Sequence, residues 1–280
     1  MTQTLLQMPG ALGLYAKALA TLGRKPGKNI RIPPLAVRIA AVQADAQRLA
    51  AYRAICGFED DGLLPIAFPQ VQASALHLWL MLQPEFPMPL MGIVHLRNRF
   101  ECLRPMPADR TFDVDASRRT HQGYEFDLLT EYRDVQGEIV YRALMTPLYR
   151  MRVEGLPKPP KPAAAPATLA DYLSFDAPAD IGRRYAPIAG DFNPIHLHAL
   201  SAKAFGFPRA IAHGMWAVAR AAAAIERVRH RPARDLAVQF RQPLLLTGRV
   251  ALRYRAAAQQ TDFALLSRTA DKVHFTGALK

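Results

Sequence analysis

The sequence has little cysteine and no long hydrophobic run. Its two cysteines, Cys56 and Cys102, stand far apart in 280 residues, which argues against a disulfide framework or a four-ligand zinc site and favours a reducing compartment. No apolar run approaches the ~18 residues that a membrane-spanning helix needs. The first basic residue is Lys17, so the start of the chain lacks the pattern of a secretory signal. We therefore expect a cytoplasmic protein without a membrane span.

Acidic residues are also scarce: 23 stand against 36 lysines and arginines, a net charge of +13. The imbalance is strongest in residues 181–280, where 16 basic residues face 5 acidic ones. Such a surface can steer a polyanion or an acidic partner protein toward the molecule, or it can be merely solvated. Because the basic residues are scattered singly and lie in no recognisable nucleic-acid motif, we expect no nucleic-acid binding.

The composition that remains is that of a globular protein, with 50% hydrophobic and 21% charged residues. The length corresponds to about two domains of common size. Residues 154–170 contain five prolines, a composition typical of a stiff linker. We therefore divide the chain into an N-terminal helical segment (1–27), an N-terminal half (28–153), a linker (154–170) and a C-terminal half (171–280).

The two halves follow the same order, which suggests a duplication. A Phe-Pro pair precedes each predicted helix, over Val71–Leu82 in the first half and Ala210–Val228 in the second. Phe100 and Phe240 lie 140 positions apart in two predicted strands, Val94–Glu101 and Asp235–Arg241. Period-two alternation predicts further strands, at Thr111–Ala116, Tyr124–Tyr132, Ile139–Leu148, Arg249–Ala256, Asp262–Ser267 and Val273–Ala278. Helices packed on such strands indicate an α+β layer structure.

Upstream of these helices the halves diverge at one informative position. The pattern Tyr-x-x-Ile-x-Gly occurs at 52–57 and again at 185–190, but Phe58 follows the first copy and Asp191 the second. Only the second copy continues to a histidine, His196. This difference predicts one active half and one structural half.

Polar groups that could converge on one point gather between Tyr185 and Met215. Gly190 allows a tight turn and Pro194 disfavours helix at Asn193, so Asp191, Asn193 and His196 occupy a constrained loop. An aspartate and a histidine five residues apart can share one water molecule and act as an acid/base pair.

The second chemical element is the start of the C-terminal helix at Ala212-His213-Gly214-Met215. A helix start offers free backbone N–H groups and the positive end of a dipole. Gly214 has no side chain to block approach, so a carbonyl oxygen could be stabilised there as negative charge develops. An acid/base pair beside such an amide is the minimum equipment for adding or removing water next to a thioester carbonyl.

These motifs resemble a known family. Gly-Asp-x-Asn-Pro-Ile-His (190–196), Ala-x-x-x-Gly-Phe (202–207) and Ala-His-Gly-Met (212–215) are similar to the MaoC-like, hydratase-2 dehydratases, the (R)-specific enoyl-thioester hydratases. The resemblance implies an α+β double hot-dog fold, in which two long central helices are each wrapped by an antiparallel sheet and the sheets form one continuous sheet. It also implies that the N-terminal half has lost the motif and houses the acyl chain.

By position, the resemblance implies a catalytic role for Asp191 and His196, orientation of the pair by Asn193, and an oxyanion amide at Gly214. Substrate-binding residues would then be Gly190, Phe192, Phe207 and His213. The implied reaction is reversible hydration of a trans-2-enoyl thioester to the (R)-3-hydroxyacyl thioester, without metal or redox cofactor. The substrate would be carried on coenzyme A or acyl carrier protein, and a homodimer is one assembly that this organisation allows.

Several alternatives stay open at this stage. A hot-dog thioesterase or a non-catalytic acyl-thioester or carrier-binding protein could share the fold. Two imidazoles and a carboxylate also suit zinc, so Asp191 with His196 and His198 is a rival metal site. Residues 5–22 could form an amphipathic helix on a partner or membrane surface, or pack on the protein itself. His77, His95 and His121 lie in the half without the motif and are interpreted as structural or surface histidines.

Overall fold

A computed structural model describes residues 2–26, 31–90, 92–120, 125–149 and 169–280. Most of the predicted linker, residues 154–168, lies outside the described residues, as does His121. Leu169 and Ala170 follow it, and Leu169 is buried against Ala251, Ala264, Leu266 and Val273.

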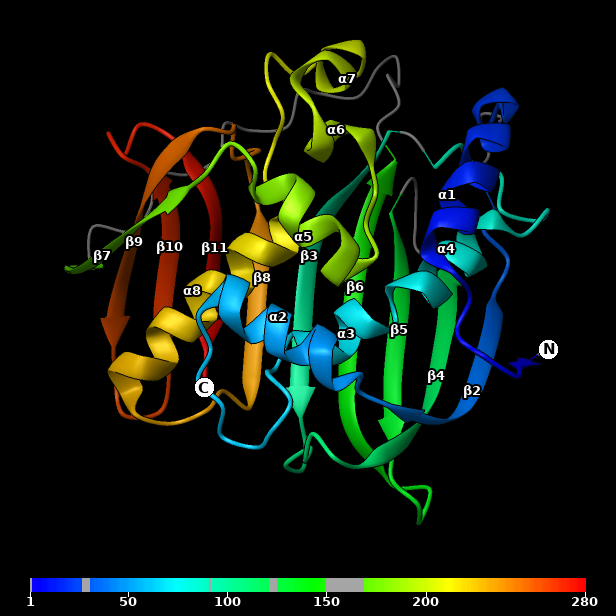
Figure 1. The fold of residues 1–280 in the computed structure, drawn as a ribbon, viewed down its shortest axis with the longest axis horizontal. Helices are drawn as coiled ribbons and strands as arrows, with labels where there is room; N and C mark the ends of the chain where they lie inside the picture. Colours follow the sequence, from blue (N-terminus) through cyan, green and yellow to red (C-terminus); the bar gives the residue numbers. More distant parts are fainter. Residues whose placement is uncertain (1, 27–30, 91, 121–124, 150–168) are drawn as a thin grey trace.

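The described chain builds one eleven-stranded sheet, which runs across the whole width of Figure 1 in the order β1-β2-β4-β5-β6-β3-β8-β11-β10-β9-β7. Neighbouring strands are antiparallel except for β1 and β2, which are parallel. The strands are β1 Thr2–Leu5, β2 Leu35–Gln43, β3 Ile93–Cys102, β4 Thr111–Thr120, β5 Phe126–Arg133, β6 Ile139–Tyr149, β7 Asp171–Ala177, β8 Asp235–Phe240, β9 Gly248–Ala256, β10 Thr261–Ser267 and β11 Val273–Leu279.

Figure 1 shows the helices in front of the sheet, so that they cover one of its faces. They are α1 Ala11–Leu19, α2 Ala46–Cys56, α3 Phe68–Gln72, α4 Ser74–Leu82, α5 Ile181–Ala189, α6 Pro194–Leu197, α7 Ala199–Ala204 and α8 Gly214–Arg229. The predicted α+β class with one continuous sheet is confirmed. The segment 1–27 is helical only from Ala11 onward, because Thr2–Leu5 pair with β2 and form the edge strand β1.

The two halves meet at β3 and β8, which pair antiparallel in the middle of the sheet. Asn98 lies opposite Val238 in this pair, and these two residues are 140 positions apart, the offset predicted from Phe100 and Phe240. A residue that pairs with its own counterpart marks a local twofold axis. The strand order reads outward as β3-β6-β5-β4-β2 on one side and β8-β11-β10-β9-β7 on the other, so the duplication extends through the sheet.

Both predicted central helices differ from the observed ones. The first is broken at Ala73, which separates α3 from α4. The second begins at Gly214 and not at Ala210, because residues 210–212 instead pair with the chain at 244–246. Ala212 N–H donates to the Leu244 carbonyl, and Leu246 N–H donates to the Ala210 carbonyl. The start of α8 is therefore held against a neighbouring loop.

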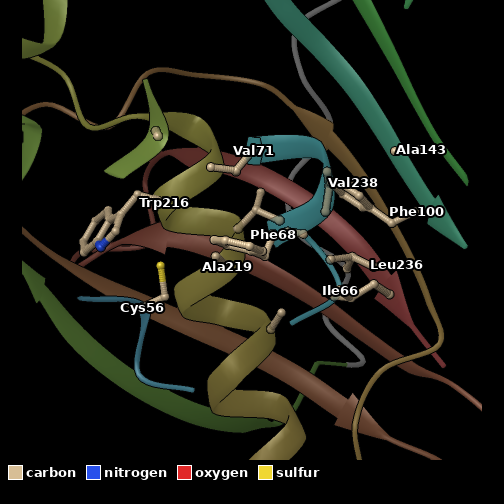
Figure 2. Close-up of a cluster of buried hydrophobic side chains, with 14 of the residues drawn as sticks. Cys56, Ile66, Phe68, Val71, Phe100, Ala143, Trp216, Ala219, Leu236 and Val238 are labelled. Atoms are coloured by element: carbon tan, nitrogen blue, oxygen red, sulfur yellow. The ribbon is translucent and has the colours of Figure 1, made fainter. Parts of the chain in front are cut away.

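Helix α8 forms the centre of the core in the C-terminal half. Its alanines 217, 219 and 221–224 are buried, and such small side chains allow neighbouring elements to approach the helix closely. Figure 2 shows Trp216 and Ala219 of α8 near Phe68 and Val71 of α3, and the buried cluster includes residues of both halves. Because protein interiors are close-packed, a displacement of buried side chains in one half changes the packing in the other half.

No helix in the described ranges is both long enough and apolar enough to cross a membrane. The apolar residues of α1 instead pack on the protein: Leu14 lies with Ala75 and Leu78 of α4 in a small buried cluster.

Candidate active site

The candidate site begins where α5 ends. Gly190 caps this helix in the left-handed conformation, with φ of 67°, a conformation that glycine adopts without steric cost. A Cβ atom there would lie 3.3 Å from the Cβ of Ala11 in α1. The chain can therefore turn sharply at Gly190, which lies against α1, and Asp191 follows directly after the end of α5.

The two carboxylate oxygens of Asp191 have different surroundings. Oδ1 accepts a hydrogen bond of 2.6 Å from the Tyr15 hydroxyl and one of 3.1 Å from the backbone N–H of Asn193. Oδ2 lies 3.9 Å from Nε2 of His196 and 3.9 Å from Nε2 of His213. These distances exceed a direct hydrogen bond, so Oδ2 retains capacity to accept from another molecule.

His196 is placed by the short helix α6. The Asn193 side chain caps this helix by accepting from the Ile195 N–H, and Pro194 occupies its first turn, an arrangement that favours a helix start. Nδ1 of His196 lies 2.9 Å from the Ile211 carbonyl oxygen. Because a carbonyl can only accept, Nδ1 carries the proton, and in the neutral ring Nε2 presents its lone pair toward Asp191.

His213 is the residue before α8 and is almost completely buried, with 2% of its surface exposed. Its Nε2 donates to the backbone carbonyl of Asp191 at 3.0 Å, and its ring stacks on His196 with 3.9 Å between the centroids. Among the described residues, Nδ1 of His213 has no hydrogen-bond partner. His213 therefore contacts both members of the predicted catalytic pair, Asp191 through a hydrogen bond and His196 through ring stacking.

The electrostatics of the pair follow from this packing. The pKa of His213 is lowered to about 4, first by burial and then by the neighbouring His196, against the opposing effect of Asp191. Burial alone would raise the pKa of the Asp191 carboxyl, but His213, His196 and the hydrogen bonds from Tyr15 and Asn193 outweigh it and lower that pKa. His213 is neutral near pH 7, and the two hydrogen bonds lower the pKa of Asp191 without requiring a charge on either histidine.

Asp191, His196 and His213 also have the composition of a metal site, since one ligand atom from each lies within 4.8 Å of the others. The hydrogen bonds argue against a complete ligand set, because Nε2 of His213 carries a proton directed at the Asp191 carbonyl oxygen. His198, which the rival sequence interpretation included, is exposed and precedes α7. In this arrangement one imidazole and one carboxylate are free to bind a ligand, fewer than zinc sites use.

Gly214 is the first residue of α8, and no side chain caps this helix start. The N–H groups of its first turn have no partner within the helix. A Cβ at Gly214 would lie 2.8 Å from Cε1 of Phe240, so the glycine also lets the Phe240 ring pack against the helix start. An oxygen atom bound here would meet backbone donors and the positive end of the helix dipole.

These groups line a cavity of about 410 Å³ that extends between the two halves. Asp191, His196 and Gly214 line one part of it. Another part is lined by Ser74, Leu78 and Met81 of α4, whose spacing of three to four residues places them on one helix face. The cavity thus joins a polar site in the C-terminal half to a mostly apolar wall in the N-terminal half.

The structure brings together most, but not all, of the predicted site residues. Gly190, Asn193, Phe207 and His213 line the same cavity as the predicted catalytic residues. Phe192 is not among the described residues that line it; its ring packs edge-on against Tyr15, with centroids 6.3 Å apart. The apolar side chain of Phe192 therefore packs against α1.

Sequence reasoning did not assign several polar residues of the cavity to the site. Tyr15, His77 and His95 all line it. Nε2 of His77 lies 2.6 Å from the Thr130 hydroxyl, with both groups buried, while Nε2 of His95 has no partner among the described residues. No local motif marks Tyr15, which is 176 positions from Asp191; the only sequence signal was the apolar pattern that predicted a helix in this segment.

Comparison with known proteins finds likenesses in sequence and in structure. Residues 158–274 match the model of the MaoC like domain. The C-terminal part of the chain therefore carries a MaoC-like domain. Over 98% of its length it is 29% identical to 3-hydroxyacyl-thioester dehydratase X of Mycobacterium tuberculosis, with 99% of that protein covered.

Solved structures agree with this assignment. The chain superposes on HtdX of Mycobacterium tuberculosis with a TM-score of 0.73 and 27% identity, covering 87% of this chain and 98% of that one. It also matches a 12:0-ACP thioesterase from Umbellularia californica, with a TM-score of 0.55, 9% identity, and 88% and 96% of the two chains covered. The second likeness shows the fold alone, so the fold by itself does not separate a dehydratase from a thioesterase.

Proposed function

We propose that this protein catalyses the reversible hydration of a trans-2-enoyl thioester to the (R)-3-hydroxyacyl thioester, and the reverse dehydration, in fatty-acid or related acyl metabolism. The observation that carries the proposal is the 3.9 Å gap between Oδ2 of Asp191 and Nε2 of His196. Both atoms accept hydrogen bonds when the carboxyl is ionised and the ring is neutral. One water molecule that donates a hydrogen to each would be held between them with an oxygen lone pair free to react.

In the hydration direction, this water attacks C3 of the enoyl group and forms the C3–O bond. The C2–C3 double bond shifts toward the thioester, and negative charge collects on the thioester oxygen. As the bond forms, the water transfers one proton to the Asp191–His196 pair, and the pair returns one proton to C2. The net change is the addition of one water molecule, and no metal or redox cofactor is required by any step.

Gly214 is assigned to the enolate. The thioester oxygen would receive a hydrogen bond from the backbone N–H at the start of α8, where the helix dipole favours negative charge. General acid/base catalysis contributes typically ~10²–10⁴-fold, and loss of an oxyanion donor costs on the order of 10²–10³-fold. An efficient enzyme therefore needs both the pair and the helix start.

The acyl chain is assigned to the wall formed by Ser74, Leu78 and Met81 in the N-terminal half. The carrier is assigned as coenzyme A or acyl carrier protein, because the excess of basic residues in 181–280 suits nucleotide phosphates or an acidic carrier surface equally.

The test is a hydration assay on enoyl-CoA thioesters of increasing chain length, followed through loss of the ultraviolet absorbance of the conjugated double bond. We expect Asp191→Asn and His196→Ala each to lower kcat by at least ~10²-fold. Because both groups act on one water, the double variant should be hardly slower than either single one. His198→Ala is the matched control, since this histidine is exposed and lies two residues from His196.

Three results would contradict the proposal. Full activity in either single variant would remove the acid/base assignment. Release of free thiol with no 3-hydroxyacyl product would identify a thioesterase. Tight binding of enoyl thioesters without any absorbance change would identify a non-catalytic binding protein.

A further inference from the structure

Helix α1 precedes the first long strand of the N-terminal half and reaches the candidate site. Strand β1 and α1 precede β2, and the C-terminal half has no counterpart of β1 in the described sheet. Leu14 packs with Ala75 and Leu78 of α4, and Figure 1 shows α1 next to α4. Ala11 lies against Gly190, so α1 covers the turn that presents Asp191.

The side chain that α1 contributes is Tyr15. Its hydroxyl donates to Oδ1 of Asp191 at 2.6 Å, and its ring is held edge-on by Phe192. A carboxylate can rotate about its Cβ–Cγ bond, and two donors on one oxygen restrict that rotation. With the Tyr15 hydroxyl and the Asn193 N–H both on Oδ1, Oδ2 is left on the side of His196.

We propose that Tyr15 is a positioning residue of the hydratase site, which holds the Asp191 carboxylate with Oδ2 aimed at the water shared with His196. This inference rests on the proposed function for its kinetic consequences, but the hydrogen bond itself can be tested without activity. It makes the N-terminal segment a part of the active site.

The Tyr15 hydroxyl remains a hydrogen-bond donor because its pKa is raised. Burial raises the pKa of Tyr15 well above its usual value, and the charge of Asp191 and the hydrogen bond to it raise it further. The phenol therefore stays protonated over the whole range in which the enzyme would work. In return, the Tyr15 hydrogen bond is one of the contacts that lower the pKa of Asp191.

Other titratable groups also act on Asp191 and must be considered in any pH experiment. His196 of α6 and His213 before α8 lie nearest to it. His95 of β3 and Tyr185 of α5 interact with its charge from the elements packed against the site. All four residues are retained when position 15 is substituted. A difference in the pKa of Asp191 between wild type and a Tyr15→Phe variant therefore reports the loss of the Tyr15 hydroxyl.

The decisive variant is Tyr15→Phe, which keeps the ring that packs on Phe192. We expect kcat to fall roughly tenfold or more, as for loss of a hydrogen bond to a charged group, while KM changes little. The acid limb of the pH profile of kcat should move to higher pH, because Asp191 loses a contact that lowers its pKa. Tyr172→Phe is the matched control, since Tyr172 is exposed on β7 and its hydroxyl is far from this chemistry.

A second measurement does not need turnover. In protein labelled with ¹³C at aspartate Cγ, the Asp191 resonance is assigned by its absence in Asp191→Asn and followed through a pH titration. We expect the Asp191 midpoint to rise in Tyr15→Phe and to stay unchanged in Tyr172→Phe. An unchanged Asp191 midpoint in Tyr15→Phe would overturn the proposal whether or not the wild-type protein turns over any thioester.

The kinetic outcomes separate the two hypotheses. An inactive wild-type protein whose Asp191 titration still shifts in Tyr15→Phe would contradict the hydratase function and leave the hydrogen bond established. An active wild-type protein with an equally active Tyr15→Phe variant and the same pH profile would contradict the positioning role alone. A change confined to KM would mean that Tyr15 binds substrate and does not orient Asp191.

Discussion

Gly182→Ala should disturb the spacing of the catalytic pair without changing either member. Gly182 is the second residue of α5 and is buried. A Cβ atom there would overlap the backbone carbonyl oxygen of His196 and lie 2.9 Å from the carbonyl carbon. Because the obstacle is backbone and not the end of a flexible side chain, one of the two helices has to move.

The geometry indicates what that movement changes. Helix α5 leads directly to Asp191, whereas His196 belongs to α6. The close contact at Gly182 therefore helps to set the distance between Oδ2 of Asp191 and Nε2 of His196. Helix α6 has little freedom to yield, because the Ile211 N–H donates to the Ile195 carbonyl at 3.1 Å and the Ser201 hydroxyl donates to the Pro194 carbonyl at 2.7 Å.

The magnitudes can be worked from these contacts. Overpacking a close-packed site costs typically ~1–3 kcal/mol, against which replacing glycine by alanine within a helix gains at most ~1 kcal/mol. We expect a net loss of up to about 2 kcal/mol in the free energy of unfolding. Displacement of a reacting group by ~1 Å can cost ~10²-fold in rate, so the loss in kcat should exceed what the change in stability would suggest.

The assay combines equilibrium urea denaturation and steady-state hydration kinetics on the same preparations. Gly13→Ala is the matched control: Gly13 lies within α1, and a Cβ there would meet nothing within 4 Å. It should stabilise the protein slightly and leave kcat unchanged. If Gly182→Ala matched wild type in both stability and turnover, the close approach of α5 and α6 would not be what spaces Asp191 and His196.

Two further predictions concern the buried histidines and the acyl wall. The pKa of His77, His95 and His213 is lowered to about 4 in each case, mainly by burial. Between pH 6.5 and 4 these imidazoles therefore take up protons when the protein unfolds. The free energy of unfolding should fall as the pH falls through this range, by up to ~1.4 kcal/mol per pH unit for each histidine. Urea denaturation at a series of pH values gives the free energy of unfolding as a function of pH. The slope of this dependence should be shallower in His77→Gln and unchanged in the exposed His198→Gln. Equal slopes in wild type and His77→Gln would refute this account. Met81→Ala should shift the preference in kcat/KM toward longer acyl chains by roughly 10-fold, as expected for altered apolar contacts in a binding pocket, and Leu78→Trp toward shorter ones; an unchanged chain-length profile in both would locate the acyl chain elsewhere.

The strands could be predicted from sequence because their signal is local. A strand buried on one face alternates apolar and polar residues with a period of two, and each predicted strand overlaps an observed one. The offset of 140 residues was likewise readable, since the duplicated central strands keep their phenylalanines. The edge elements were missed: β2 and β7 stand near the outer edges of the sheet, and β1 is fixed only by pairing with β2.

The helix boundaries were less predictable because tertiary contacts set them. An apolar run at 210–213 is compatible with helix, yet its backbone pairs with residues 244–246, more than thirty positions away. The predicted site residues came from one segment of thirty-one residues, and its loop geometry is encoded locally by Gly190, Asn193 and Pro194. Tyr15 and His95 reach the same cavity from distant parts of the chain, where no spacing rule applies.

The helix ends at Gly57 and Gly190 differ in what surrounds them, and only the second is followed by an aspartate. Both glycines end their helices in the left-handed conformation, as the repeated pattern predicts. After Gly57, Phe58 stacks on Tyr52 with centroids 6.1 Å apart, and a Cβ at Gly57 would meet the guanidinium of Arg220. An aromatic ring and an arginine of α8 therefore fill the region that corresponds to the Asp191 turn.

At Gly190 the neighbours are different: Ala11 and the Ser74 hydroxyl lie against it, and Ser74 donates to the Ala189 carbonyl at 2.8 Å. Both come from segments N-terminal to β3, so the half without the motif supports the turn of the half that keeps it. A duplicated unit whose second copy relies on the first for its active-site support is not expected to work alone. The N-terminal half thus carries Phe58 where the second copy carries Asp191, and it supplies α1 and Ser74, which support the Asp191 turn.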